Sequence, residues 1–349
     1  MAKKDDSHKA SHASELRRDV VSGDWVAIAT GRAKRPHDFL RQRRESFRQP
    51  KNTCPFENIH DEALLILPAG KTMSAGASRS GRNDWIVQVI PNKYPAFGVG
   101  TCAVLGHVGP YEWTEGVGAH EVVIFRDHDK SLATMTHAEV GMVIAAYQER
   151  FRALARDDCA QYVSVFHNHG RLSGASISHP HSQIVSLPVI PPDVARSLAG
   201  SAEYFRRNRS CVHCAVVQYE LARDTRVIYE NGRFAVLAPY ASKTAFEMRL
   251  FPIRHSAEFE NMDEDDRAAA ADALGMALAK LHKGLKNPDY NFFLHTAPVK
   301  DGQTAQHYHW HIEILPKTAI WAGFEIGTGI EISTITPESA AAFLKNVKI

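Results

Sequence analysis

The chain carries one ordered set of cysteines and histidines twice, and this repeat constrains the fold more than any other feature. In each half a cysteine precedes a histidine and then an H-x-H motif: Cys54, His128 and His179 in the first half, and Cys211, His255 and His309 in the second. The last two members are 51 residues apart in the first half and 54 apart in the second. We therefore interpret the chain as an internal duplication with an α+β fold, each half an antiparallel sheet with at least one packed helix.

The local patterns around these residues also recur in one order. Strand-like and turn-like segments are followed by a helical pattern and two more strands: 84–97, 119–132, 136–156, 162–170 and 177–188 in the first half, and 226–242, 246–259, 263–285, 290–298 and 307–316 in the second. The stretch VIPPDVARS at 189–197 indicates a break between halves. We predict a disordered polar tail at 1–15, a catalytic first repeat at 16–192 and a structural second repeat at 193–349.

Composition excludes several classes of function. The chain has 349 residues, 44% of them hydrophobic, which is a composition typical of a soluble protein with a large core. Its net charge of +2 is too balanced to indicate a nucleic-acid partner. It shows no signal-like start and no apolar run of membrane-span length, so we expect a cytoplasmic protein without a membrane partner. In that reducing compartment we expect Cys102 and Cys159, which lack a partner pattern, to be buried small residues.

Two sets of side chains have the composition of metal sites. The second half offers a Cys-x-x-Cys pair and two histidines, which would complete a tetrahedral zinc site: Cys211, Cys214, His255 and His309. The first half offers the corresponding set with a carboxylate in place of one thiolate: Cys54, Glu57, His128 and His179. A carboxylate can bind zinc, but Glu57 could instead be a surface residue beside a weak or empty site. We expect one or two zinc ions per chain.

The motif ISHPHSQIVSLP at 177–188 places two histidines on one side of a strand. If His179 holds a metal, His181 beside it is free to react. A neutral imidazole is a good nucleophile and can accept a nucleotidyl group as a phosphoramidate. In an isolated H-x-H motif, one histidine is more often structural and the other a core or surface residue with its polar atoms satisfied. The second half keeps both histidines but has Glu313 in the place of Gln183, and a carboxylate would repel a phosphate, so we expect only the first copy to be catalytic.

In these residues and in their order, the chain closely resembles the galactose-1-phosphate uridylyltransferase family of the histidine-triad superfamily. The resemblance rests on several motifs: RRDVVSGDWVAIATGRAKRP, VIPNKYPAF, DHDKSL, FHNHGRLSGASISHPHSQ, YHWHIEILP and AGFEIGTG. It implies a HIT-like fold of two tandem repeats, a homodimer, and ping-pong transfer through a covalent nucleotidyl-histidine. Its substrates would be nucleotide-sugars and sugar phosphates.

The resemblance also implies roles for individual residues. His181 matches the nucleophile, Gln183 the glutamine that binds the transferred phosphoryl group, and His179, His128 and Cys54 the metal ligands. The implied substrate-binding residues are Arg32 and Arg35 of the basic loop, Asn92, Asn168, Ser176 and the hexose-side Glu325.

Departures from the family pattern leave the substrate open. Glu57 replaces a cysteine, and Glu331 and Ser333 occupy positions near the expected sugar pocket. The leading prediction is a UDP-glucose–hexose-1-phosphate uridylyltransferase. The alternatives are an ADP-glucose phosphorylase or an adenylylsulfate:phosphate adenylyltransferase, with the same nucleotidyl-histidine. A third hypothesis, of another class, is a non-catalytic, zinc-stabilised nucleotide-binding module.

Overall fold

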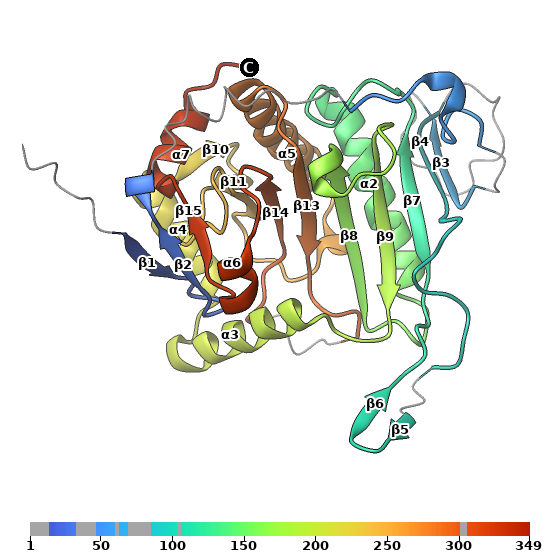
Figure 1. Ribbon diagram of the computed structural model, residues 1–349, viewed down its shortest axis with the longest axis horizontal. Helices are drawn as coiled ribbons and strands as arrows, with labels where there is room; N and C mark the ends of the chain where they lie inside the picture. The colour runs from blue at the N-terminus through green and yellow to red at the C-terminus, as the bar shows by residue number, and fades with distance from the viewer. Residues whose placement is uncertain (1–13, 33–46, 60–62, 69–84, 103–105, 301–305) are drawn as a thin grey trace, which may run out of the picture.

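The computed structural model describes residues 14–32, 47–59, 63–68, 85–102, 106–300 and 306–349 (Figure 1). Strands pair mainly in antiparallel fashion, and helices pack against them, which confirms the predicted α+β class. Within these residues, no helix combines the length and apolar character needed to cross a membrane.

One ten-stranded antiparallel sheet forms the centre of the molecule (Figure 1). Its strands lie in the order β10 (Val227–Glu230), β11 (Phe234–Leu237), β12 (Met248–Pro252), β14 (His311–Pro316), β13 (Tyr290–His295), β8 (Tyr162–His169), β9 (His181–Leu187), β7 (His120–Phe125), β4 (Trp85–Pro91) and β3 (Leu65–Pro68). The strands of the two halves meet at β8 and β13, which pair antiparallel from Tyr290↔His169 to Leu294↔Val165. The halves therefore share one sheet, and this pairing covers an edge that each half would otherwise expose.

Two long helices cover one face of this sheet. They are α2 (His137–Leu154) and α5 (Glu264–Leu285), one from each half, and both contribute to the main hydrophobic core. α2 begins with a capping box between Thr136 and Glu139, and the side chain of Asp263 accepts a hydrogen bond from the backbone of Asp266 at the start of α5. Small residues let the helices approach closely, since Gly141 of α2 faces Ala271 of α5.

The remaining helices lie around the sheet and its edges. They are α3 (Pro192–Asn208), α4 (Val212–Arg223), α6 (Gly323–Thr328), α7 (Pro337–Lys345) and the short turns η1 (Thr30–Arg32), η2 (Lys51–Thr53), η3 (Arg171–Ser173) and η4 (Phe259–Asn261).

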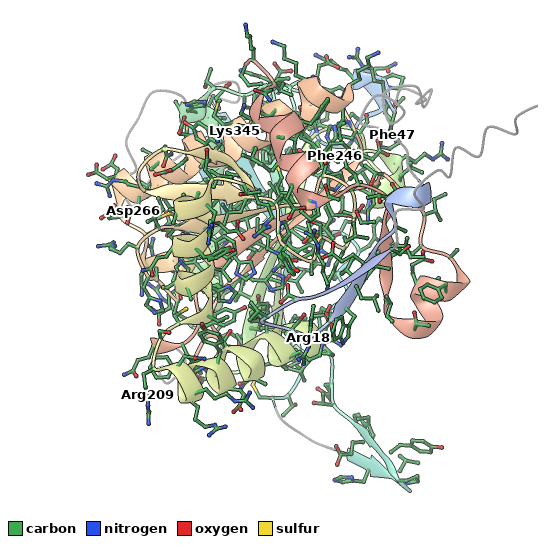
Figure 2. The ribbon with its side chains drawn as sticks, turned by 90° about the vertical axis from the view of Figure 1, so that its left-hand side faces the viewer. Arg18, Phe47, Arg209, Phe246, Asp266 and Lys345 are labelled. Atoms are coloured by element: carbon green, nitrogen blue, oxygen red, sulfur yellow. A yellow bond between two sulfur atoms is a disulfide. The ribbon has the colours of Figure 1, made fainter. Side chains whose placement is uncertain are left out.

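A small sheet joins the two ends of the chain. β1 (Glu15–Arg18) pairs antiparallel with β2 (Trp25–Ile28), and β2 pairs parallel with β15 (Glu331–Ser333). Residues 1–13 of the predicted tail lie outside the described residues, and Glu15 already begins β1. The hairpin of β5 (Gly106–Val108) and β6 (Tyr111–Trp113) projects from the body of the molecule (Figures 1 and 2).

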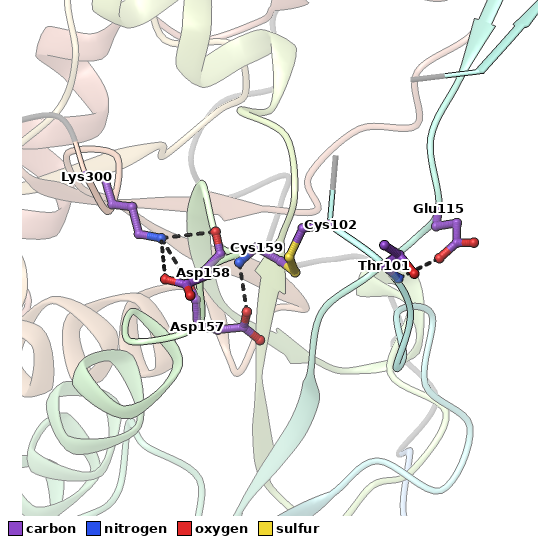
Figure 3. Close-up of a disulfide and its surroundings, with 7 residues drawn as sticks. All are labelled: Thr101, Cys102, Glu115, Asp157, Asp158, Cys159 and Lys300. Atoms are coloured by element: carbon purple, nitrogen blue, oxygen red, sulfur yellow. Dashed lines mark hydrogen bonds and ion pairs between the residues drawn. A yellow bond between two sulfur atoms is a disulfide. The ribbon is translucent and has the colours of Figure 1, made fainter. Parts of the chain in front are cut away.

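The prediction for Cys102 and Cys159 is wrong. A disulfide joins them, Cys102 is exposed and Cys159 is half-buried (Figure 3). The bond ties the segment before β5 to the loop between α2 and β8. The sequence pattern misses this pair because 57 residues separate its members, and only the folded chain brings the two loops together.

Candidate functional site

The face of the central sheet opposite α2 and α5 carries the polar side chains of interest. Strand residues alternate between faces, so Ile184 and Val165 point into the core while their neighbours point the other way. The register places Gln183 between Val122 and Phe166, and Phe166 in turn lies opposite Phe293 and its neighbour Glu313. Both H-x-H strands therefore present their chemistry on one continuous surface.

His181 lies at the start of β9, and one of its ring nitrogens is engaged in a hydrogen bond with the backbone. Its Nδ1 donates a hydrogen bond to the carbonyl oxygen of His179 at 2.9 Å. The proton of the neutral ring is thereby fixed on Nδ1, and Nε2 keeps its lone pair. Burial lowers the pKa of His181, which favours the neutral form. The ring of Phe56 packs edge-on against it, with centroids 5.1 Å apart.

Gln183 follows on the same face of β9. Its Oε1 lies 2.7 Å from Nε2 of His120 on β7. Between His181 and Gln183, Ser182 points into the core, where its hydroxyl meets the Tyr147 hydroxyl at 2.6 Å and His167 Nδ1 at 3.0 Å. These buried contacts anchor the back of the strand and fix which side chains face forward.

The four ligands predicted for the first half converge on one point. Nδ1 of His128 lies 3.1 Å from Nδ1 of His179, and Oε1 of Glu57 lies 3.2 Å and 3.6 Å from these two nitrogens. Cys54 Sγ lies 3.6 Å from His179 Nδ1. Zinc bonds of about 2.0–2.3 Å place tetrahedral ligand atoms roughly 3.3–3.8 Å apart, so the spacing fits such an ion.

Hydrogen bonds behind the rings strengthen this fit. His179 Nε2 donates to the carbonyl of Phe125 at 2.6 Å, and His128 Nε2 donates to that of Gln49 at 2.9 Å. Both Nδ1 atoms therefore direct lone pairs at each other, an arrangement that a cation between them would relieve. Glu57 lies inside the cluster and not on the open surface.

The second predicted set also comes together. Cys214 Sγ lies 3.3 Å from Nδ1 of His255 and 3.5 Å from Nδ1 of His309. The Cys211 thiol completes the group, with all four ligand atoms within 4.8 Å of one another. His309 Nε2 donates to the carbonyl of Pro252 at 2.9 Å, which repeats the arrangement of His179. The donor set of two thiols and two imidazoles fits structural zinc.

Three of the six predicted substrate-binding residues lie near the first-half site. Asn168 accepts a hydrogen bond from Asn291 at 2.7 Å, and continuing the register of β8 and β9 places it beside His181. Asn92 lies next to His120, with Nδ2 of the asparagine 3.1 Å from Nε2 of the ring. Ser176 is exposed in the loop before β9, and its carbonyl accepts from Gln49.

The other three predicted substrate residues do not join this group. Glu325 accepts a hydrogen bond from the backbone of Ala322 at the start of α6, and within the described chain it makes no polar contact with the first-half site. Arg35 lies outside the described residues, and Arg32 ends η1, with its side chain also outside the description.

Gln49 is a further residue of this site, and no sequence motif indicates it. Its backbone N–H donates to the Ser178 hydroxyl at 2.8 Å, and its side-chain oxygen accepts from the Ser178 backbone at 2.8 Å. Together with the bond to His128, these contacts tie the segment before η2 to the loop that carries His179. No motif marks Gln49, because two of its contacts use its backbone and its side chain meets only backbone groups of the loop before β9.

The second-half strand faces a different environment. His311 Nδ1 donates to the carbonyl of His309 at 3.1 Å, as His181 does to His179. Glu313, however, forms an ion pair with Arg249 at 3.0 Å, and Arg249 also pairs with Asp19 at 3.0 Å. A cavity of about 480 Å³ lies before these strands and is lined by Asn168, Asn291, His295, His311 and Glu313, among others.

Comparison with family models gives two matches. The model described as galactose-1-phosphate uridyl transferase, N-terminal domain, matches residues 4–191. A second model, a domain of unknown function, matches residues 114–346.

Known proteins match over nearly the full length. ADP-glucose phosphorylase of Arabidopsis thaliana is 32% identical over 97% of this chain and 94% of that protein. Galactose-1-phosphate uridylyltransferase of Thermotoga maritima is 25% identical over 96% of this chain and 99% of its own. The crystal structure of the Arabidopsis thaliana ADP-glucose phosphorylase with bound ADP-glucose has a TM-score of 0.77 at 30% identity, covering 97% of this chain and all of that one.

Proposed function

Since this chain belongs to the galactose-1-phosphate uridyl transferase family, we propose that it transfers a nucleotidyl group from a nucleoside diphosphate hexose through covalent nucleotidyl-His181. The observation that carries the proposal is the hydrogen bond from His181 Nδ1 to the carbonyl of His179, which leaves the Nε2 lone pair available. His311 has the same ring orientation, but the ion-paired carboxylate Glu313 follows it on the strand. His181 is followed by the neutral Gln183, which does not repel a phosphate.

In the first half-reaction, His181 Nε2 attacks the α-phosphorus of the donor in line. A nitrogen–phosphorus bond forms, the bond to the bridging oxygen breaks, and the hexose-1-phosphate leaves with the bonding electrons. The ring becomes cationic in the adduct, and the carbonyl of His179 stabilises that charge by accepting from Nδ1.

Around the phosphorus, Gln183 would donate to a non-bridging oxygen through its amide. A preorganised donor of this kind contributes about 2.7–4 kcal/mol to transition-state stabilisation. Asn168 and Ser176 are proposed to contact the phosphate and nucleotide side of the donor. In the second half-reaction an anionic acceptor attacks the same phosphorus and restores neutral His181.

Two zinc ions are proposed, each structural. Cys54, Glu57, His128 and His179 would hold one, and Cys211, Cys214, His255 and His309 the other. Bound zinc would cross-link the loops that precede β9 and β14 and would keep His181 aimed outward.

We favour an adenylyl donor, with inorganic phosphate as acceptor. Support comes from the 32% identity to an ADP-glucose phosphorylase, against 25% to the Thermotoga maritima uridylyltransferase. A uridylyl donor with a hexose-1-phosphate acceptor is the second candidate, supported by the family model over residues 4–191.

The test is to incubate the protein separately with ADP-glucose, UDP-glucose and adenylyl sulfate, and to record intact-protein mass spectra without acid. We expect an adenylyl adduct that disappears when phosphate is added. A uridylyl adduct discharged by galactose-1-phosphate would select the second candidate. The absence of an adduct from every donor would refute nucleotidyl transfer.

A further inference from the structure

We propose that His120 is a positioning residue that sets the amide orientation of Gln183, so that its NH₂ group, and not its carbonyl oxygen, faces the phosphate before His181. This inference rests on the proposed function above. It assigns a role to a residue on β7 that belongs to neither metal cluster.

The tautomer of His120 follows from one backbone contact. The N–H of Ala96 donates to His120 Nδ1 at 3.2 Å. A backbone amide can only donate, so Nδ1 carries a lone pair and the proton of the neutral ring lies on Nε2.

The second ring nitrogen then determines the orientation of Gln183. His120 Nε2–H donates to Gln183 Oε1 at 2.7 Å. Asn92 Nδ2, 3.1 Å from the same nitrogen, cannot accept this proton, because it is itself a donor group. The Gln183 oxygen is therefore engaged by His120, and its NH₂ group points away from the ring.

The orientation matters because the two ends of an amide are opposite in character. Among the described residues, no group accepts a hydrogen bond from Gln183 Nε2, which leaves it available to a ligand. With the amide reversed, its carbonyl oxygen would face the non-bridging oxygens of the phosphate and repel them.

The loop after β4 keeps His120 in place. Asn92 N–H donates to the His120 carbonyl at 2.8 Å, and the Asn92 side-chain oxygen accepts from the backbone of Tyr94 at 2.9 Å. Together with the Ala96 bond, these contacts hold both the backbone and the ring. Residues of the motif VIPNKYPAF thus contact His120, which in turn contacts Gln183.

Two substitutions separate the functions of the two ring nitrogens. His120→Asn places an oxygen near the position of Nδ1, which can accept from Ala96, but it removes the donor to Gln183. His120→Gln places an amide donor near the position of Nε2 and loses the Ala96 acceptor. We expect His120→Asn to slow single-turnover formation of nucleotidyl-His181 by up to roughly 100-fold. His120→Gln should keep most of the wild-type rate of adduct formation. The Kd of the nucleoside diphosphate hexose should change little in either variant.

A double-mutant cycle with Gln183→Ala distinguishes positioning from a general structural role. If His120 acts through Gln183, His120→Asn should cost nothing further once Gln183 is alanine. Independent, multiplying losses, or a wild-type rate in His120→Asn, would overturn the proposal. His137→Asn is the control, since this exposed histidine at the start of α2 pairs with Asp272, and it should react like wild type.

The same measurements also distinguish a failure of the proposed role of His120 from a failure of the proposed nucleotidyl transfer. A wild-type protein that forms no adduct refutes nucleotidyl transfer, and the role of His120 falls with it. A wild-type protein that forms the adduct normally, together with an additive cycle, refutes the role of His120 alone.

Discussion

The H-x-H strands of the two halves share one backbone design and differ in what surrounds it. In both, the first histidine donates Nε2–H to a carbonyl of the neighbouring strand segment, Phe125 or Pro252. In both, the second histidine donates Nδ1–H to the carbonyl of the first. The arrangement of these rings is therefore a property of the shared framework, and it does not by itself make a strand catalytic.

The difference arises two residues further along each strand. Gln183 is neutral and meets His120, whereas Glu313 is an acid that meets Arg249. Burial alone would raise the pKa of Glu313, but Arg249 and a hydrogen bond with His311 lower it well below its usual range. A buried carboxylate beside His311 repels phosphate, so the surroundings of the second strand suit an ion-pair network and not nucleotidyl transfer.

The strongest test of this contrast substitutes the second histidine of each motif by asparagine. Asparagine can still donate to the preceding carbonyl, but it removes the Nε2 nucleophile. His181→Asn should lower the rate of adduct formation by at least about 10³-fold, and His311→Asn should leave it near wild type. Intact-protein mass spectrometry measures both, and loss of the adduct only in His311→Asn would reverse the assignment.

The two ligand clusters should differ in their contribution to stability. Cys211→Ala removes a buried thiolate from the four-membered set and should lower the free energy of unfolding by more than about 4 kcal/mol. Glu57→Ala leaves two imidazoles and a thiol in the first set and should cost less. Urea unfolding and bound zinc per chain measure the difference. Equal losses would show that the carboxylate and the thiolate contribute alike.

Exchanging the distinguishing ligands should shift zinc affinity in opposite directions. Glu57→Cys gives the first site a second soft ligand, and it should raise the zinc affinity by about tenfold, or about 1.4 kcal/mol. Cys214→Glu should weaken the second site by a comparable factor. Competition with a chromophoric chelator gives the affinities. A first site that binds zinc more weakly after Glu57→Cys would contradict the proposed role of position 57 as a zinc ligand.

The smallest expected effect concerns the matched helices α2 and α5. Thr136→Ala removes the capping box of α2, and Asp263→Ala removes the side-chain cap of α5. Each should lower the free energy of unfolding by about 1 kcal/mol without changing adduct formation. A selective effect of Thr136→Ala on adduct formation would show that α2 does more than support the sheet behind β9.

The sequence predicts those parts of the site that depend on residue type and order. The eight ligands repeat in order, so the spacing alone indicates two clusters, and the structure brings each cluster together. The roles of His181 and Gln183 in transfer stay predictions. Arg32 and Arg35 also stay predictions, because their side chains lie outside the described residues.

Contacts that depend on loop paths could not be predicted. Gln49 and His120 each make hydrogen bonds between a backbone N–H and a side chain that no motif specifies. The Cys102–Cys159 bond joins two loops that are remote in sequence. Likewise, the residue pattern within each half indicates strands, but it does not indicate that β8 and β13 pair. Which strand edges pair depends on the tertiary structure.

The parallel pairing of β2 with β15 has a consequence for how the chain matures during synthesis. β2 lies near the start of the chain and its partner Glu331–Ser333 near the end. On the ribosome, every residue between Ile28 and Glu331 must be added before this neighbour of β2 emerges. Until then the buried side chains of β2, Val26 and Ile28, lack the neighbouring strand β15.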